Sequence, residues 1–182
     1  MAVHVRGHPI HTILVAFPIG LLTFAMVFDV IFSVTGGAGW YTAAYYNLLF
    51  GLITAVPTAI FGFFDFTQIT DERAADVAVQ HMVVNVGALL LYLVSFLVRA
   101  TAGAGSTAPM YGIGWRFALG LSVGGALLLM VGGWLGGHLV YRHRVGVGIE
   151  PANHLVPKPD HDEAGNAATD FPDFPATEPG LA

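Results

Sequence analysis

The chain has 182 residues, of which 55% are hydrophobic and only 10% are charged, and its net charge is −5. Soluble domains carry roughly a quarter of charged residues, so this composition excludes an ordinary soluble protein. The absence of cysteine excludes disulfides, thiolate metal sites and iron–sulfur ligation within this chain. No basic surface with interleaved aromatic residues suggests a nucleic-acid partner.

Four apolar runs dominate the chain. A helix needs about 20 apolar residues to cross a hydrocarbon core about 30 Å thick. The first run is too long for the apolar part of a cleaved signal peptide, and three more spans follow it. The sequence therefore predicts an all-α integral membrane four-helix bundle that crosses up, down, up and down. The predicted spans are Thr12–Val34, Thr42–Phe64, Met82–Val98 and Ile113–Leu135, and residues 74–80 extend the third helix into the headgroup region.

This topology defines two membrane faces. Face A holds the N-terminus, the connection Asp65–His81 and the C-terminus, and face B holds the connections Thr35–Tyr41 and Arg99–Gly112. Lys and Arg are in excess on the cytoplasmic side of membrane proteins. Face A has the larger number of arginines close to the spans, which predicts that both termini are cytoplasmic: Arg6, Arg73, Arg142 and Arg144 against Arg99 and Arg116.

Charge divides the chain into two regions. Residues 1–144 form the predicted transmembrane domain. Residues 145–182 hold one Lys, seven acidic residues and six of the ten prolines. An acidic, proline-rich segment buries too little apolar surface to offset the entropy of ordering, so we expect a disordered tail. No internal repeat is evident within the chain.

Polar residues recur along one stripe of each helix, and lipid makes exposed polar groups costly, so the stripes are expected to face inward. Near face B, we predict a structural ion pair of Asp29 with Arg99 and Arg116. The fourth span is rich in glycine. Its glycines either allow close helix packing or make room for a flat macrocycle beside His138.

The main functional lead is a group of histidines near face A: His8, His11, His81 and His138. Three interpretations stay open. The first is a b-type haem with axial ligands from two helices, His11 and His81. The second is a non-haem metal held by His8, His11 and His81. The third is a hydrogen-bonded network without a cofactor.

Two further residues are predicted to support the imidazoles. Asp65 lies at the same depth and is expected to orient an imidazole through a hydrogen bond, and Asn85 shares an inward stripe with His81. No histidine lies near face B, so a second bis-histidine haem is not expected.

Several motifs resemble one family. The segments HPIHTILVAFPIGLL at 8–22, GFFDFTQI at 62–69, RAADVAVQHMVVN at 73–85 and GGHLVYRHRVGVG at 136–148 are similar to a prokaryotic family of predicted membrane proteins, the domain of unknown function 2231. The resemblance implies a bacterial cytoplasmic membrane protein and, since some members occur with Rieske-type iron–sulfur domains, redox work with such a domain on a separate polypeptide. It also implies that His138 is a weaker ligand candidate than His8, His11 and His81.

The functional prediction is an electron-transfer or accessory subunit of a quinone-linked membrane complex, with the lipid bilayer and redox subunits as partners. The alternative is a structural subunit or assembly factor without a cofactor. The sequence contains no hydrolytic triad, phosphate-binding loop or paired carboxylates, so a stand-alone enzyme is not predicted. No inverted repeat or pair of broken helices indicates a transporter.

Overall fold

The computed structural model describes residues 4–5, 8–101 and 109–146, with side chains from Ile10 onward. The predicted tail 145–182 therefore lies almost entirely outside the described residues. Before the helices, β1 (His4–Val5) and β2 (His8–Pro9) form a short antiparallel pair. The helices are α1 (Ile10–Leu14), α2 (Ala16–Thr35), α3 (Ala38–Phe66), α4 (Glu72–Thr101) and α5 (Gly112–Tyr141).

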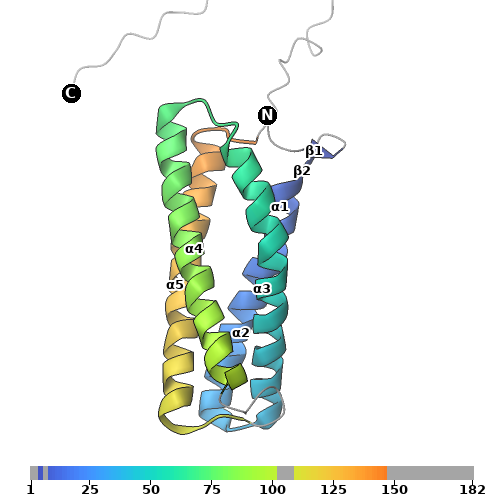
Figure 1. The fold of residues 1–182 in the computed structure, drawn as a ribbon, viewed down its shortest axis with the longest axis vertical. Coiled ribbons are helices and arrows are strands. Elements are labelled where there is room, and N and C mark those ends of the chain that lie inside the picture. Colours follow the sequence, from blue (N-terminus) through green and yellow to red (C-terminus); the bar gives the residue numbers. More distant parts are fainter. Residues whose placement is uncertain (1–3, 6–7, 102–108, 147–182) are drawn as a thin grey trace, which may run out of the picture. The chain divides into compact units, whose positions relative to one another are not determined.

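The predicted all-helical membrane bundle is confirmed (Figure 1). Four helical segments are long and apolar enough to cross a bilayer, and α1 with α2 forms the first of them. Large apolar side chains such as Phe17, Ile53 and Met130 are more than half exposed, as helices surrounded by lipid require. The first predicted span runs through α1 and α2, and each of the other three lies inside its helix. The helix α4 begins at Glu72, which confirms the predicted extension of the third helix toward face A.

A proline breaks the first span. Pro18 has no N–H group, so the carbonyl of Leu14 loses its helical partner. The structure ends α1 at Leu14 and begins α2 at Ala16. The chain stays continuous across the break through the bonds of Val15 N to the His11 carbonyl and Ile19 N to the Val15 carbonyl. The break before Pro18 thus leaves a short helical segment that carries His11 separately from α2.

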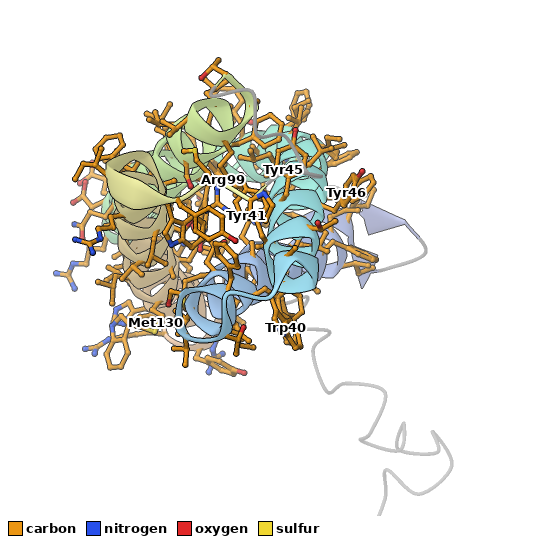
Figure 2. The ribbon with its side chains drawn as sticks, turned by 90° about the horizontal axis from the view of Figure 1, so that it is seen from below. Trp40, Tyr41, Tyr45, Tyr46, Arg99 and Met130 are labelled. Carbon is orange, nitrogen blue, oxygen red and sulfur yellow. The ribbon has the colours of Figure 1, made fainter. Side chains whose placement is uncertain are left out.

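Two antiparallel hairpins make up the bundle. The most extensive contacts are those between α2 and α3 and between α4 and α5, while α2 also contacts α5 and α3 also contacts α4. This order places α2 and α4 at diagonal corners, as the view along the bundle shows (Figure 2). Both of these helices run from face A to face B, and α3 and α5 return.

The two hairpins bury equivalent positions. Buried residues of α2 correspond to buried residues of α4 that lie 70 positions later in the sequence. This is also the separation of Asp29 and Arg99. They are the pairs Pro18 and Ala88, Leu22 and Tyr92, Ala25 and Ser95, and Asp29 and Arg99. In α3 and α5 the shared buried positions are the pairs Tyr41 and Trp115, Ala44 and Ala118, Leu48 and Ser122, Gly51 and Gly125, and Thr58 and Gly132.

The two hairpins therefore share a pattern of burial, which the residue identities of the chain did not indicate. The return helices are offset by about one further turn because the connection 102–111 is longer than the connection 36–37. Equivalent glycines also receive equivalent side chains. A Cβ atom at Gly51 would lie 2.6 Å from Leu22, and one at Gly125 would lie 2.8 Å from Tyr92. The fold is a parallel repeat of two hairpins.

Candidate functional site

His11 is fixed by a hydrogen bond to α3, the helix beside it. Its Nδ1 atom lies 3.0 Å from the main-chain oxygen of Thr58 in α3. A carbonyl only accepts hydrogen bonds, so Nδ1 carries the proton and donates it. The ring of His11 also packs against Gly62, where a Cβ atom would lie 2.7 Å from the ring carbon Cε1. Only glycine leaves room for the imidazole at this position.

The second histidine repeats this arrangement in the other hairpin. The Nδ1 atom of His81 lies 2.9 Å from the main-chain oxygen of Gly132 in α5, so Nδ1 again donates. A Cβ atom at Gly136 would lie 3.0 Å from the ring carbon Cε1 of His81. His11 and His81 have the same separation as Asp29 and Arg99, and therefore occupy equivalent positions of the repeat.

The shared pattern has a geometric cause. A helical side chain leans toward the N-terminus, so the residue four positions on covers the carbonyl of the turn before it. Glycine at that position uncovers the carbonyl, and its second lone pair accepts a bond from outside the helix. Gly62 stands four residues after Thr58, and Gly136 four after Gly132. Each hairpin thus pairs one imidazole with one uncovered carbonyl.

These bonds determine the chemistry of both rings. When Nδ1 donates a proton to a carbonyl, the neutral imidazole keeps an unprotonated Nε2 atom, whose lone pair accepts a hydrogen bond or binds a metal. Metal-bound histidines have this arrangement, with Nδ1–H bonded to a carbonyl or carboxylate and Nε2 on the metal. The site offers two Lewis bases near face A.

Asn85 makes the two halves different. Its side-chain amide nitrogen donates to the main-chain oxygen of His81 at 2.7 Å and lies 3.3 Å from both ring nitrogens of that residue. Its carboxamide also occupies the space above Gly132, where a Cβ atom would approach Oδ1 to 2.5 Å. The equivalent residue of the first hairpin is Val15. An amide therefore supports His81 but not His11.

The other predicted site residues lie elsewhere or outside the description. The backbone of His8 lies in β2, and its side chain is not described. His138 lies about 200° around α5 from Gly136, so it is turned away from His81. Among the described side chains, no three His, Asp or Glu groups are close enough to hold a metal ion. The predicted three-histidine site depends on His8 and stays a prediction.

Two further sequence predictions concern Asp65 and the glycines of α5. Asp65 is half-buried in the last turn of α3, and its predicted bond to an imidazole stays a prediction. Gly132 and Gly136 already accommodate Asn85 and His81. At these two glycines the structure fits the first of the two alternatives, close packing, and the space that the other alternative places beside His138 is not made by them.

A buried ion pair joins the diagonal helices near face B. Arg99 donates to both carboxylate oxygens of Asp29, at 2.7 and 2.6 Å, and both side chains are at most 1% exposed. Arg116, which was predicted to join them, is exposed and takes no part in this described pair. Asp29 lies 18 residues beyond His11, so the ion pair and the imidazoles are about 27 Å apart along the bundle.

Sequence reasoning missed the residues that surround the ion pair. The Arg99 guanidinium also lies 3.3 Å from the hydroxyl oxygens of Ser95 and Ser122. Its central carbon lies 5.8 Å from the ring centre of Tyr41 and 5.1 Å from that of Trp115, as expected for cation–π contacts. Figure 2 shows Arg99 and Tyr41 together near the centre of the bundle. One signal in the sequence could have revealed this arrangement: His11 and His81 are separated by the same 70 residues as Asp29 and Arg99.

Comparison with known proteins identifies one relation. A family model described as "Predicted membrane protein (DUF2231)" matches residues 7–148. No curated protein and no solved structure matches the chain. The match covers both hairpins, including the two histidines, their carbonyl acceptors and the buried ion pair.

Proposed function

This chain belongs to the DUF2231 family and is an integral membrane protein, and we propose that it binds one b-type haem between His11 and His81. The observation that supports the proposal is the pair of equivalent imidazoles, each with Nδ1 bonded to a helical carbonyl. His11 and His81 would hold the iron through their Nε2 atoms, and the Asn85 amide, which lies 3.3 Å from Nε2 of His81, would give up that contact.

The donor set fits haem better than a smaller metal centre. Two neutral imidazoles would be enough to hold the iron of a haem, whereas a structural zinc site needs four protein ligands. The bonds to Thr58 and Gly132 would hold the rings in orientation and raise their basicity. A bound haem would supply one-electron oxidation and reduction. The chain's own residues would hold its iron and exclude water.

Exchange of electrons would take place near face A. No histidine stands near face B in the sequence, so a single haem would serve a quinol or a protein partner on one side of the membrane. We place the chain as an electron-transfer or accessory subunit of a quinone-linked complex. A separate Rieske-type protein is a suitable partner, because this chain has no cysteine to hold an iron–sulfur cluster.

A scaffold without cofactor is the second candidate. The bonds from His11 to α3 and from His81 to α5 each join the two helices of one hairpin. Such interhelical bonds stabilise membrane bundles by about 0.6 kcal/mol on average. In that case the imidazoles only strengthen the hairpins, and their Nε2 atoms bind no metal.

Optical spectroscopy of the purified protein distinguishes the two candidates. We expect a Soret band and a reduced α band in protein produced with haem available, and loss of both bands in His11→Ala and His81→Ala. His138→Ala should keep the bands because His138 is turned away from the site. A colourless wild-type protein that also fails to bind added haemin would refute the haem proposal and leave the scaffold.

We also propose that face A is cytoplasmic, as the distribution of arginines indicates. The chain has no cysteine, so single cysteines report topology without interference. A membrane-impermeant maleimide applied to intact cells should label Tyr111→Cys at face B and spare Thr67→Cys at face A. The opposite labelling pattern would invert the proposed orientation.

A further inference from the structure

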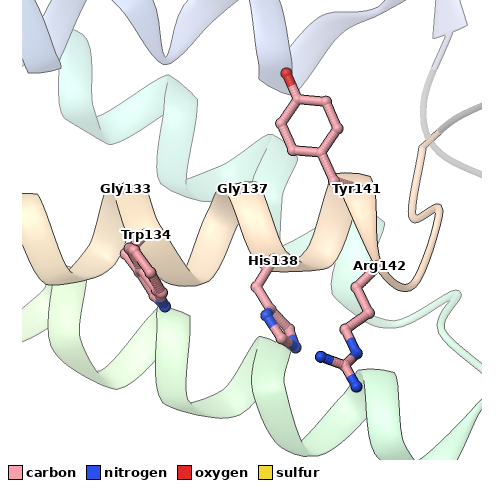
Figure 3. A pocket seen from close by; sticks show the side chains of 6 residues that line it. All are labelled: Gly133, Trp134, Gly137, His138, Tyr141 and Arg142. Atoms are coloured by element: carbon pink, nitrogen blue, oxygen red, sulfur yellow. The ribbon is translucent and has the colours of Figure 1, made fainter.

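A groove runs along the outer surface of α5 near face A. The residues that line it recur every four positions along α5. Trp134, His138 and Arg142 point to one side of the helix, while Tyr141 points to the other (Figure 3). The floor between these side chains is formed by Gly133 and Gly137. This surface has no part in the histidine site inside the bundle.

The floor of the groove is empty. A Cβ atom at Gly133 or at Gly137 would meet nothing within 4 Å, whereas Gly136, one position away, holds the ring of His81. Trp134 is 77% exposed and Tyr141 is 88% exposed, so both aromatic side chains project from the helix. Aromatic residues of this kind concentrate at the boundary between hydrocarbon and headgroups. The groove is therefore a shallow apolar surface that ends at that boundary.

Positive charge lies at the end of the groove that is nearer face A. Arg142 follows the last residue of α5 and has no ion-pair partner among the described residues. The ring of His138 is 5.4 Å from that of His143. The described acidic group that approaches this cluster is Asp71, whose carboxylate is 4.0 Å from Nδ1 of His143. The guanidinium is thus available to an anion from outside the protein.

We propose that this groove binds an anionic phospholipid of the surrounding bilayer. One acyl chain lies on the bare backbone at Gly133 and Gly137 beside Trp134, and the phosphate lies at Arg142 and His138. Charge favours this occupant over a second copy of the chain, because a twofold contact along the same glycines would bring two Arg142 guanidinium groups together. An arginine near the surface contributes about 1 kcal/mol of attraction to anionic lipid, which is about fivefold in affinity.

Quenching of Trp134 by brominated lipids tests the proposal. The full chain carrying Trp40→Phe is reconstituted in phosphatidylcholine vesicles that contain brominated phosphatidylglycerol, or brominated phosphatidylcholine as reference. Trp115 is only 7% exposed, so Trp134 dominates the lipid-dependent signal. We expect phosphatidylglycerol to be preferred about fivefold at Trp134. Arg142→Gln should remove this preference, and the matched variant Arg116→Gln near face B should keep it.

A second variant tests the groove itself. Gly137→Leu fills the groove and should weaken the quenching of Trp134 by both lipids. Gly120→Leu, at an equally open glycine of α5, should not weaken it. Circular dichroism confirms that each variant is helical. The proposal is overturned if Arg142→Gln keeps the preference for phosphatidylglycerol or if soluble phosphate displaces the lipid. It is also overturned if Gly137→Leu leaves quenching intact and dissociates an oligomer.

Discussion

Removal of one member of the buried ion pair should destabilise the bundle more than removal of both. Arg99→Met keeps the length of the side chain and leaves the Asp29 carboxylate buried without its two hydrogen bonds. Asp29→Leu leaves the guanidinium with only two serine hydroxyls at 3.3 Å and two aromatic rings. The double variant replaces both charges with apolar groups of similar size.

The burial of the pair sets the magnitude. Both side chains are at most 1% exposed, so water does not compensate for a lost partner. Breaking such a pair costs about 3–5 kcal/mol, whereas replacing the whole pair by apolar residues is often nearly neutral. We therefore expect each single variant to lose about 3 kcal/mol or more of the free energy of unfolding. The double variant should regain most of this loss.

Reversible unfolding in mixed detergent micelles, followed by circular dichroism, measures these differences. Arg116→Met is the control, because Arg116 is exposed at the same end, and surface substitutions usually change stability by less than about 0.5 kcal/mol. Additive losses, with the double variant as unstable as the sum of the two single variants, would show that the two charges do not act as a pair.

Three further substitutions follow from the packing. Gly62→Ala should displace the imidazole of His11 and cost about 1–3 kcal/mol in unfolding assays, while Gly20→Ala, which meets nothing within 4 Å, should stabilise or be neutral. Tyr92→Phe should not destabilise, because its buried hydroxyl has no hydrogen-bond partner among the described atoms, and a loss above about 1 kcal/mol would reveal a hidden partner. Ser122→Ala should cost about 1 kcal/mol in the same assay, since its hydroxyl bonds Ser95 and Arg99, and an unchanged stability would count against those bonds.

The sequence predicts the fold well because lipid makes one requirement dominant. Every span must be apolar and satisfy its own backbone, so hydropathy alone located the four helices. The correspondence between the two hairpins is weak in the sequence because, apart from a few pairs such as His11 and His81, the equivalent positions hold different residues. Asp29 and Arg99 are equivalent positions with opposite charges, and Leu22 corresponds to Tyr92. A sequence comparison scores both pairs as mismatches.

The interior contacts of the site were harder to predict than its residue types. The sequence pointed to His11 and His81, but their acceptors are main-chain oxygens, which carry no signature in the identity of Thr58 or Gly132. The informative residues were the glycines four positions further on. Glycine in a membrane helix is usually interpreted as a site of helix contact. Here Gly62 and Gly136 accommodate an imidazole instead.

The opposite charges at equivalent positions have a consequence for the way the two hairpins assemble. Two copies of the first hairpin docked as the halves are would place two carboxylates face to face, and two copies of the second would oppose two guanidinium groups. Only unlike halves are complementary at this point. The two hairpins are therefore not interchangeable at this point of the bundle, although their buried positions correspond.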